Sequence, residues 1–152
     1  MTVNPQSHNT RHVMNRKVKH REWYRPFAPM VTEEDSQKYF TNTAPVPYMS
    51  VICYTREEYR DKLPSITHVD GTARIQTINP MQNKFIYDSL KEFEKIKGMP
   101  IFLNTSYNPA GEPILNFCEV GLQMLDDTDL DLVIIGNVVF SNHAKRSLLE
   151  AL

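Results

Sequence analysis

Cysteine and glycine are both scarce in this sequence. Its 152 residues include two cysteines, Cys53 and Cys118, and five glycines. The cysteines are far apart, lie among apolar residues and lack the short spacing of metal ligands. This pattern argues against a disulfide framework and against a zinc site. We interpret both cysteines as reduced thiols in the hydrophobic core.

Long apolar runs are also missing. No stretch approaches the roughly 20 consecutive apolar residues that a membrane-spanning helix needs, and no apolar run follows Met1 in the manner of a secretory signal. These features predict a soluble, cytoplasmic protein that does not bind a membrane. A hydrophobic content of 41% over this length suffices for one domain with its own core.

Neither sign of charge is in excess. The sequence has 17 Lys and Arg against 18 Asp and Glu, which argues against nucleic-acid binding through net charge. The charges are nevertheless unevenly placed, because residues 11–25 are strongly basic and residues 112–131 are acidic. A local positive region of this kind suits a small anion, and a solvated helix face is an equally good interpretation.

The common motifs of nucleophilic, phosphate-binding and metal chemistry are absent from the sequence. The five histidines show no metal-ligand spacing, and there is no GxxxxGK[ST] loop, GxGxxG fingerprint or GxSxG elbow. The sequence therefore predicts no metal site and no protein nucleophile.

Periodicity and turn residues predict alternating helices and strands. Residues 1–14 are polar and are expected to form a tail or cut linker, followed by one domain over 15–152. Helices are predicted at 13–22, 32–40, 85–97, 117–127 and 142–152, and strands at 26–31, 46–54, 66–69, 73–78, 100–103, 132–135 and 138–140. The mixture of hairpins and crossover helices predicts an α/β fold with a twisted mixed β-sheet covered by helices.

The first of three unusually polar segments reads KHREWYRPFAP over residues 19–29. Its cations Lys19, Arg21 and Arg25 precede an extended apolar stretch, so the fold can hold them near the edge of a sheet. Arginine presents a fork of donors that matches phosphate or carboxylate oxygens, and lysine adds a point charge. The segment is a candidate phosphate site; solvation of a helix end is the alternative.

The second segment reads DGTARIQT over residues 70–77. Gly71 permits a tight turn, after which Arg74 and Gln76 are expected on one face of a strand. An arginine and an amide side by side on rigid structure can recognise an anion and a base, whereas an ordinary polar surface strand is the alternative.

The third segment, NTSYN over residues 104–108, follows the predicted buried strand at 100–103 directly. Small hydroxyls and amides at the end of a buried strand can orient phosphate or ribose without adding charge. A polar turn that caps backbone groups is the alternative.

In order and spacing, VKHREWYRPFAP, ITHVDGTARIQTI and PIFLNTSYNPAGEPI resemble the C-terminal domain of the carbamoyltransferase family. This family includes nodulation and antibiotic-tailoring O-carbamoyltransferases, and the resemblance covers residues 15–139. It implies a fold like that of threonylcarbamoyl-AMP synthase (YrdC-like). It also implies that ATP, with Mg²⁺, and carbamoyl phosphate form carbamoyl adenylate, which a separate N-terminal domain, in cis or trans, passes to a hydroxyl.

The same resemblance implies which residues line the site. The residues carried over as catalytic are Lys19, Arg25 and Arg74, and those carried over as substrate- or nucleotide-binding are Lys19, Arg21, Arg25, Thr72, Arg74, Gln76, Asn104, Ser106 and Asn108. Lys19, Arg25 and Arg74 are expected to converge on one concave site. The sequence departs from the family pattern at Tyr107, where phenylalanine is usual, and the N-terminal domain with its metal-binding histidines is not within these 152 residues.

Two other functions compete with the carbamoyl-activating domain. One is a non-catalytic nucleotide- or RNA-binding module derived from it. The other, suggested by fold analogy alone, is threonylcarbamoyl-AMP synthesis. Turnover of ATP that depends on carbamoyl phosphate distinguishes the first interpretation from both.

Overall fold

The computed structural model describes residues 1–141 and divides into two compact units. The first comprises residues 1–12 and 24–105, and the second comprises residues 13–23 and the chain from residue 106. We call them unit 1 and unit 2 and describe each by itself. The predicted helix at 142–152 lies outside the described residues.

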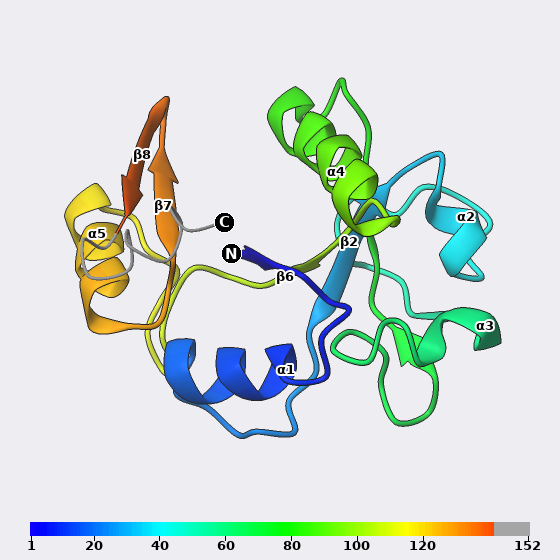
Figure 1. The fold of residues 1–152 in the computed structure, drawn as a ribbon, viewed down its shortest axis with the longest axis horizontal. Coiled ribbons are helices and arrows are strands. Elements are labelled where there is room, and N and C mark those ends of the chain that lie inside the picture. Colours follow the sequence, from blue (N-terminus) through cyan, green and yellow to red (C-terminus); the bar gives the residue numbers. More distant parts are fainter. Residues whose placement is uncertain (142–152) are drawn as a thin grey trace. The chain divides into compact units, whose positions relative to one another are not determined.

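A mixed four-stranded sheet forms the centre of unit 1 (Figure 1). Its strands are β1 (Thr2–Val3), β6 (Ile101–Asn104), β2 (Ala28–Thr32) and β5 (Gln76–Ile78), in that spatial order. β2 is parallel to β5 and antiparallel to β6, and β1 is antiparallel to β6. The predicted α/β class with a mixed sheet is therefore confirmed.

The N-terminal residues contribute to this sheet, whereas the sequence suggested a polar tail or linker at 1–14. Thr2 pairs with Asn104 and Val3 with Leu103, and the Met1 amino group donates to the Thr105 carbonyl at 2.7 Å. A helical stretch follows in α1 (Thr10–Val13) and a π-helical η1 (Met14–Val18). The polar composition was misleading because an edge strand of two residues requires only backbone pairing.

Helix α4 (Lys84–Lys97) packs on β2 and β6 and lies where the sequence predicts a helix. The Asn83 side chain accepts a hydrogen bond from the Ile86 N–H, and Gly98 ends the helix with a φ of 80°. These are the usual N-cap and C′ arrangements. The helix buries Leu90 completely against Met30 and Ile78 of the sheet.

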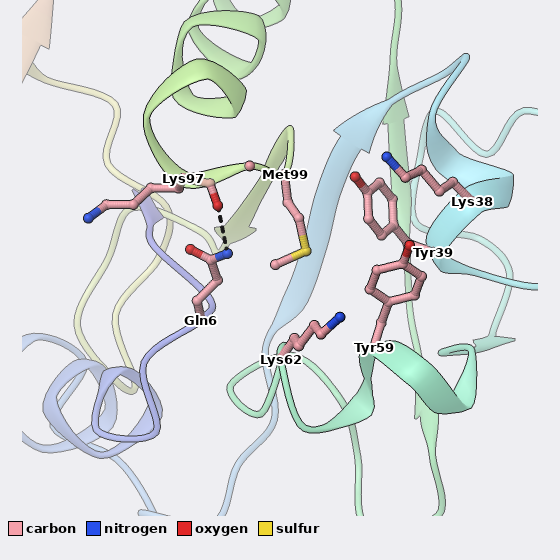
Figure 2. A pocket seen from close by; sticks show the side chains of 8 residues that line it. Gln6, Lys38, Tyr39, Tyr59, Lys62, Lys97 and Met99 are labelled. Atoms are coloured by element: carbon pink, nitrogen blue, oxygen red, sulfur yellow. Dashed lines mark hydrogen bonds between the residues drawn. The ribbon is translucent and has the colours of Figure 1, made fainter.

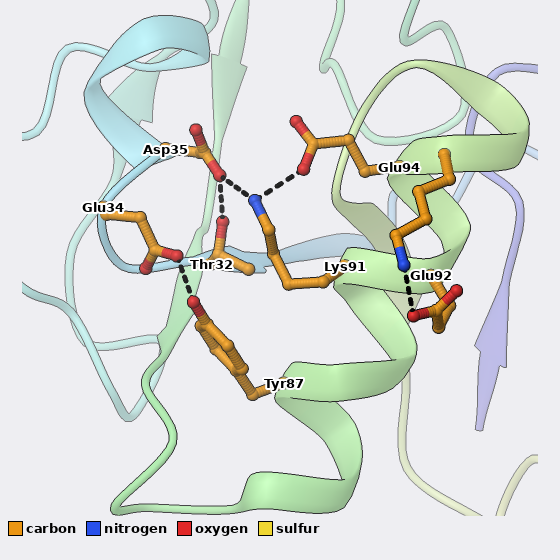
Figure 3. Close-up of polar contacts among 8 residues, drawn as sticks. Thr32, Glu34, Asp35, Tyr87, Lys91, Glu92 and Glu94 are labelled. Carbon is orange, nitrogen blue, oxygen red and sulfur yellow. Dashed lines mark hydrogen bonds and ion pairs between the residues drawn. The ribbon is translucent and has the colours of Figure 1, made fainter.

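Polar side chains fix the same helix to the corner between β2 and α2 (Ser36–Tyr39), as Figure 3 shows. The Lys91 ammonium lies 3.2 Å from Asp35 Oδ2 and also pairs with Glu94. These bonds raise the pKa of Lys91, the Glu94 contact most strongly. Thr32 donates to the same Asp35 oxygen at 2.7 Å. Because each charged group in this cluster has an opposite charge or a hydroxyl as its partner, we interpret the cluster as structural.

Three predictions for the middle of unit 1 were wrong. The segment 46–54 is a strand only at β3 (Cys53–Tyr54), because Pro45 and Pro47 flank Val46 and cannot donate to a sheet. The segment 66–69 forms a turn after α3 (Glu57–Arg60), and β3 pairs instead with β4 (Thr72–Ala73). The helix predicted at 32–40 is limited to α2, since Thr32 belongs to β2.

Unit 2 contains η1, helix α5 (Cys118–Asp127) and a hairpin of β7 (Leu132–Ile135) and β8 (Val138–Ser141). Gly136 has a φ of 60° and joins the two strands as predicted, with Ile135 opposite Val138. α5 packs against β7 (Figure 1). Phe117 occupies the N-cap position of α5, without a capping hydrogen bond from its side chain. Cys53 is buried as expected, but Cys118 is exposed, and both thiols are free.

Candidate functional site

Lys19 is the central polar residue of unit 2. It directly follows η1, and only 2% of its surface is exposed. Its ammonium donates to the Ser106 carbonyl at 2.9 Å and to the Asn108 carbonyl at 2.6 Å. The Asn108 side-chain oxygen lies at 2.7 Å and the Ser106 hydroxyl at 3.2 Å. The structure thus joins the first and third polar segments through one buried cation.

The Lys19 charge is balanced by neutral oxygens alone. Within the described residues no carboxylate forms an ion pair with this ammonium. Burial, followed by repulsion from Arg21, lowers the pKa of Lys19 to about 8. The unfolded chain binds this proton more tightly, so the contribution of Lys19 to stability rises with pH between about 8 and the ordinary value of 10.5.

The segment around Lys19 is held by further bonds within unit 2. The Arg21 Nε donates to the Asn15 side-chain oxygen at 2.7 Å, and the Asn15 amide donates to the Trp23 carbonyl at 3.1 Å. Lys17 pairs with Asp129 at 3.0 Å, which joins the basic region to the acidic one. Asn15 is fully buried and was missed as a positioning residue. Its only sequence signal is an amide one helical turn before Lys19.

Ser106 and Asn108 form the polar loop that contacts Lys19. The Ser106 hydroxyl donates to the Asn108 side-chain oxygen, and the Asn108 amide donates to the Glu112 carbonyl at 2.6 Å. The Lys19 carbonyl accepts from the Ala110 N–H at 2.8 Å. The loop therefore presents several oxygens toward one ammonium, which is an arrangement that an anionic ligand can enter by replacing some of them.

In unit 1, the sheet topology places four of the predicted site residues at one end. Met30 is opposite Gln76 in the parallel pair, so the N-terminal ends of β2 and β5 lie together, preceded by Arg25 and Arg74. Because Ala28 is opposite Asn104 in the antiparallel pair, the C-terminal end of β6 lies there too. Both arginines are exposed.

The amides of Gln76 and Asn104 are fixed by each other. Asn104 Nδ2 donates to Gln76 Oε1 at 2.9 Å, and Gln76 Nε2 donates to the Pro47 carbonyl at 2.9 Å. β5 and β6 both neighbour β2, so this bond links the two outer strands across the central one. Arg74 and Gln76 do not share a continuous strand, because Arg74 lies between β4 and β5.

Thr72 begins β4, directly after the turn at Asp70 and Gly71. Its hydroxyl donates to Asp70 Oδ1 at 2.7 Å and lies 3.1 Å from His68 Nδ1. Because the single hydroxyl hydrogen is directed to Asp70, the hydrogen of the bond between Thr72 and His68 belongs to Nδ1. Burial lowers the pKa of His68. The positive charges of Arg74 and Arg11 lower it further, and the negative charge of Asp70 opposes this shift. His68 is therefore neutral at pH 7 and stabilises the turn, a role that its position before DG could have suggested.

The predicted site residues thus divide between the two units. Unit 2 brings together Lys19, Arg21, Ser106 and Asn108. In unit 1, Gln76 bonds to Asn104 at the end of the sheet where Arg25 and Arg74 precede β2 and β5. That Lys19 converges with the two arginines stays a prediction. Among residues 1–141 there is no group of three or more His, Cys, Asp or Glu side chains suited to a metal ion.

No helix in the described part of the chain is both long and apolar enough to cross a membrane.

Comparison with known proteins agrees with the three-segment resemblance. A family model described as "Carbamoyltransferase C-terminus" matches residues 1–142. Nodulation protein NolO of Bradyrhizobium diazoefficiens is 40% identical over 126 residues, covering 81% of this chain and 23% of that protein. Nodulation protein NolNO of Sinorhizobium fredii is 40% identical over 127 residues, covering 82% of this chain and 19% of that protein. An uncharacterized Synechocystis protein is 35% identical over 161 residues, covering 93% of this chain and 26% of that protein.

The chain spans about a quarter or less of the length of these three relatives. The family match, in contrast, extends over nearly all of this chain. It includes β1, the strand that composition alone did not reveal. The chain belongs to the carbamoyltransferase C-terminal domain family.

Proposed function

We propose that this chain binds ATP and carbamoyl phosphate and forms carbamoyl adenylate for transfer to a hydroxyl group. The observation that carries the proposal is the buried Lys19 ammonium, which has only neutral oxygens around it and lies between two of the family's sequence segments. A buried cation without a carboxylate partner is suited to receive an anionic ligand.

The reaction asks the protein to position anions and to neutralise charge. An oxygen of the carbamoyl substrate forms a bond to the α-phosphorus of ATP while the bond to the β-phosphate breaks, and pyrophosphate leaves. Before this step, water attacks the phosphorus of carbamoyl phosphate and breaks its bond to the carbamoyl oxygen, so that inorganic phosphate leaves and carbamate is the carbamoyl substrate that reacts with ATP. Cations and fixed donors suffice for such a step, and no protein nucleophile is needed.

The side chains divide this work by chemistry. We assign phosphate contacts to Lys19, Arg25 and Arg74, because the guanidinium fork matches two phosphate oxygens and the ammonium supplies a mobile charge. Gln76 and Asn104 supply rigid amide groups at the end of the sheet. Ser106 and Asn108 place neutral oxygens around Lys19.

Mg²⁺ is proposed to arrive on the ATP phosphates. The described residues offer no cluster of metal-ligating side chains, and Mg²⁺ is commonly held by substrate phosphates and water together with few protein ligands. Transfer of the carbamoyl group to an acceptor hydroxyl is proposed to require a further domain, since the relatives are about four times longer than the matched part or more.

Pyrophosphate release tests the proposal directly. Residues 1–152 with ATP and Mg²⁺ are expected to release pyrophosphate and form an AMP adduct only when carbamoyl phosphate is added. Mass spectrometry of the products identifies carbamoyl adenylate. ATP binding without carbamoyl phosphate-dependent turnover contradicts the proposal and favours a non-catalytic nucleotide-binding module.

The affinity for carbamoyl phosphate or ATP is expected to fall as pH rises through about 8, because Lys19 loses its charge there. Anion binding raises the pKa of the lysine in the complex, so the loss approaches roughly tenfold per pH unit above the free value. Calorimetry from one unit below to two units above that pKa measures the slope.

The control for this pH profile is Lys19→Met, which removes the titrating group while keeping an unbranched side chain. Its affinity is expected to be lower than that of the wild type and flat over the same range. A flat profile for the wild-type chain contradicts the assignment of Lys19 to ligand binding.

A further inference from the structure

Unit 1 contains a pocket that none of the predicted site residues lines. Its volume is about 460 Å³, and its walls include Lys38, Lys62, Tyr39, Tyr59 and Met99. Figure 2 shows that these residues come from α2, from the segment around α3, and from the turn that follows α4. A space of this size accommodates a small molecule.

The walls of the pocket carry positive charge and no negative charge. Lys38, Lys62 and Lys97 line it, and no acidic residue does. Within residues 1–141 none of these lysines forms an ion pair, whereas Lys84, Lys91 and Lys95 of the neighbouring helix all do. The Lys97 side chain extends away from the tyrosines in Figure 2, so Lys38 and Lys62 are the principal cations.

Two tyrosine rings hold these cations in place. The Lys38 ammonium lies 5.2 Å from the centroid of the Tyr39 ring, and the Lys62 ammonium lies 5.2 Å from that of Tyr59. The rings pack edge to face with their centroids 4.8 Å apart. Cation–π contacts at these distances orient an ammonium without neutralising it.

Tyr39 adds an unused polar group. Its side chain is completely buried, and its hydroxyl makes no hydrogen bond of normal length, although it lies close enough to the Lys38 ammonium to raise the pKa of that lysine. A buried hydroxyl without a hydrogen bond of normal length costs stability, and a ligand oxygen that accepts from it would remove that cost. Lys38 and Lys97 lie in the last turns of α2 and α4, where the helix dipole favours a positive charge. The dipole does not explain Lys62, the lack of acidic residues in the pocket walls, or the Tyr39 hydroxyl.

We propose that this pocket binds a small anion with more than one phosphate group, held by Lys38 and Lys62, with Lys97 at the rim. Two ammonium groups on flexible stems can reach separate phosphates of one ligand, and a neutral phenol can donate to an oxygen between them. The inference does not depend on the proposed adenylation, because it uses different residues.

Inorganic pyrophosphate is a suitable probe, and Met99 is a built-in reporter because it lines the pocket. In the full chain labelled with ¹³C-methyl methionine, the Met99 resonance, identified with Met99→Leu, is expected to shift during titration with pyrophosphate. The double variant Lys38→Gln/Lys62→Gln is expected to bind at least about tenfold more weakly, through loss of charge-assisted hydrogen bonds. These lysines are exposed, so the fold is expected to persist.

The matched control is Lys84→Gln/Lys95→Gln, which removes two exposed lysines from α4 outside the pocket and is expected to bind like the wild type. A Lys19→Met/Arg74→Ala background separates this pocket from the proposed nucleotide site, and the Met99 shift is expected to persist in it. Pyrophosphate binding that leaves Met99 unshifted, an equal loss in the control pair, or no binding overturns the proposal. A Met99 shift with an acidic peptide but not with pyrophosphate also overturns it.

Discussion

Replacing Arg74 by alanine is expected to weaken the binding of ATP or carbamoyl phosphate by about 1.5–3 kcal/mol, the range for a charge-assisted hydrogen bond. Arg74 is exposed in the short segment between β4 and β5, so its truncation leaves no buried group unpaired. The Gln76–Asn104 bond next to it is independent of the guanidinium. Isothermal calorimetry with each ligand measures the effect.

The control for Arg74 is Arg56→Ala. Arg56 is also an exposed arginine of unit 1, and it donates one hydrogen bond to the Gln37 carbonyl at 2.9 Å. Removing the same charge at this position is expected to change the affinity little, because Arg56 is not among the predicted site residues. Unchanged affinity in a folded Arg74→Ala chain, or an equal loss in both variants, would remove Arg74 from the site.

Replacing Leu90 by alanine is expected to destabilise the protein by about 2–5 kcal/mol. Leu90 is completely buried where α4 packs on the sheet, in contact with Met30 and Ile78. The substitution removes apolar contact area and leaves a cavity that helix and sheet cannot close without losing other contacts. Urea unfolding is expected to show a lower midpoint with an unchanged slope.

Ile96→Ala provides the comparison within the same helix. Ile96 is 73% exposed, although its spacing from Phe93 and Leu90 suggested that it belongs to the buried stripe. Its replacement is expected to change the unfolding free energy by about 0.5 kcal/mol or less. Similar losses for the two variants would mean that α4 is not anchored through Leu90.

Short-range patterns predicted much of the secondary structure. The helix at 85–97 with its Gly98 end, the hairpin of 132–135 with 138–140 and the short strand before Asn104 are confirmed, whereas Phe85 and Ile96 of the helix are exposed. Each depends on contacts within a few residues, namely a capping amide, a glycine with positive φ or an apolar face of regular period. Such contacts are the same wherever the element lies in the fold.

Long-range pairing could not be predicted in the same way. The apolar runs at 46–54 and 66–69 have strand composition, yet only Cys53–Tyr54 pairs, and its partner is Thr72–Ala73. An apolar, β-branched composition indicates burial as well as strand pairing. Ile66, for example, is fully buried although it lies in a turn. The edge strand at Thr2–Val3 has no apolar pattern at all, since its backbone finds a partner about 100 residues along the chain.

The sequence by itself determined the family, because three separate polar segments stand in the order that is typical of it, and the residues of those segments are the ones that we propose for the site. Only the tertiary structure decided the state of those side chains. It buries Lys19 among neutral oxygens and lowers its pKa, it joins Gln76 to Asn104 across β2, and it commits the Thr72 hydroxyl to a turn. Burial and hydrogen bonding depend on which distant segments meet, and the free energy of a charge depends on that environment more than on the residue type.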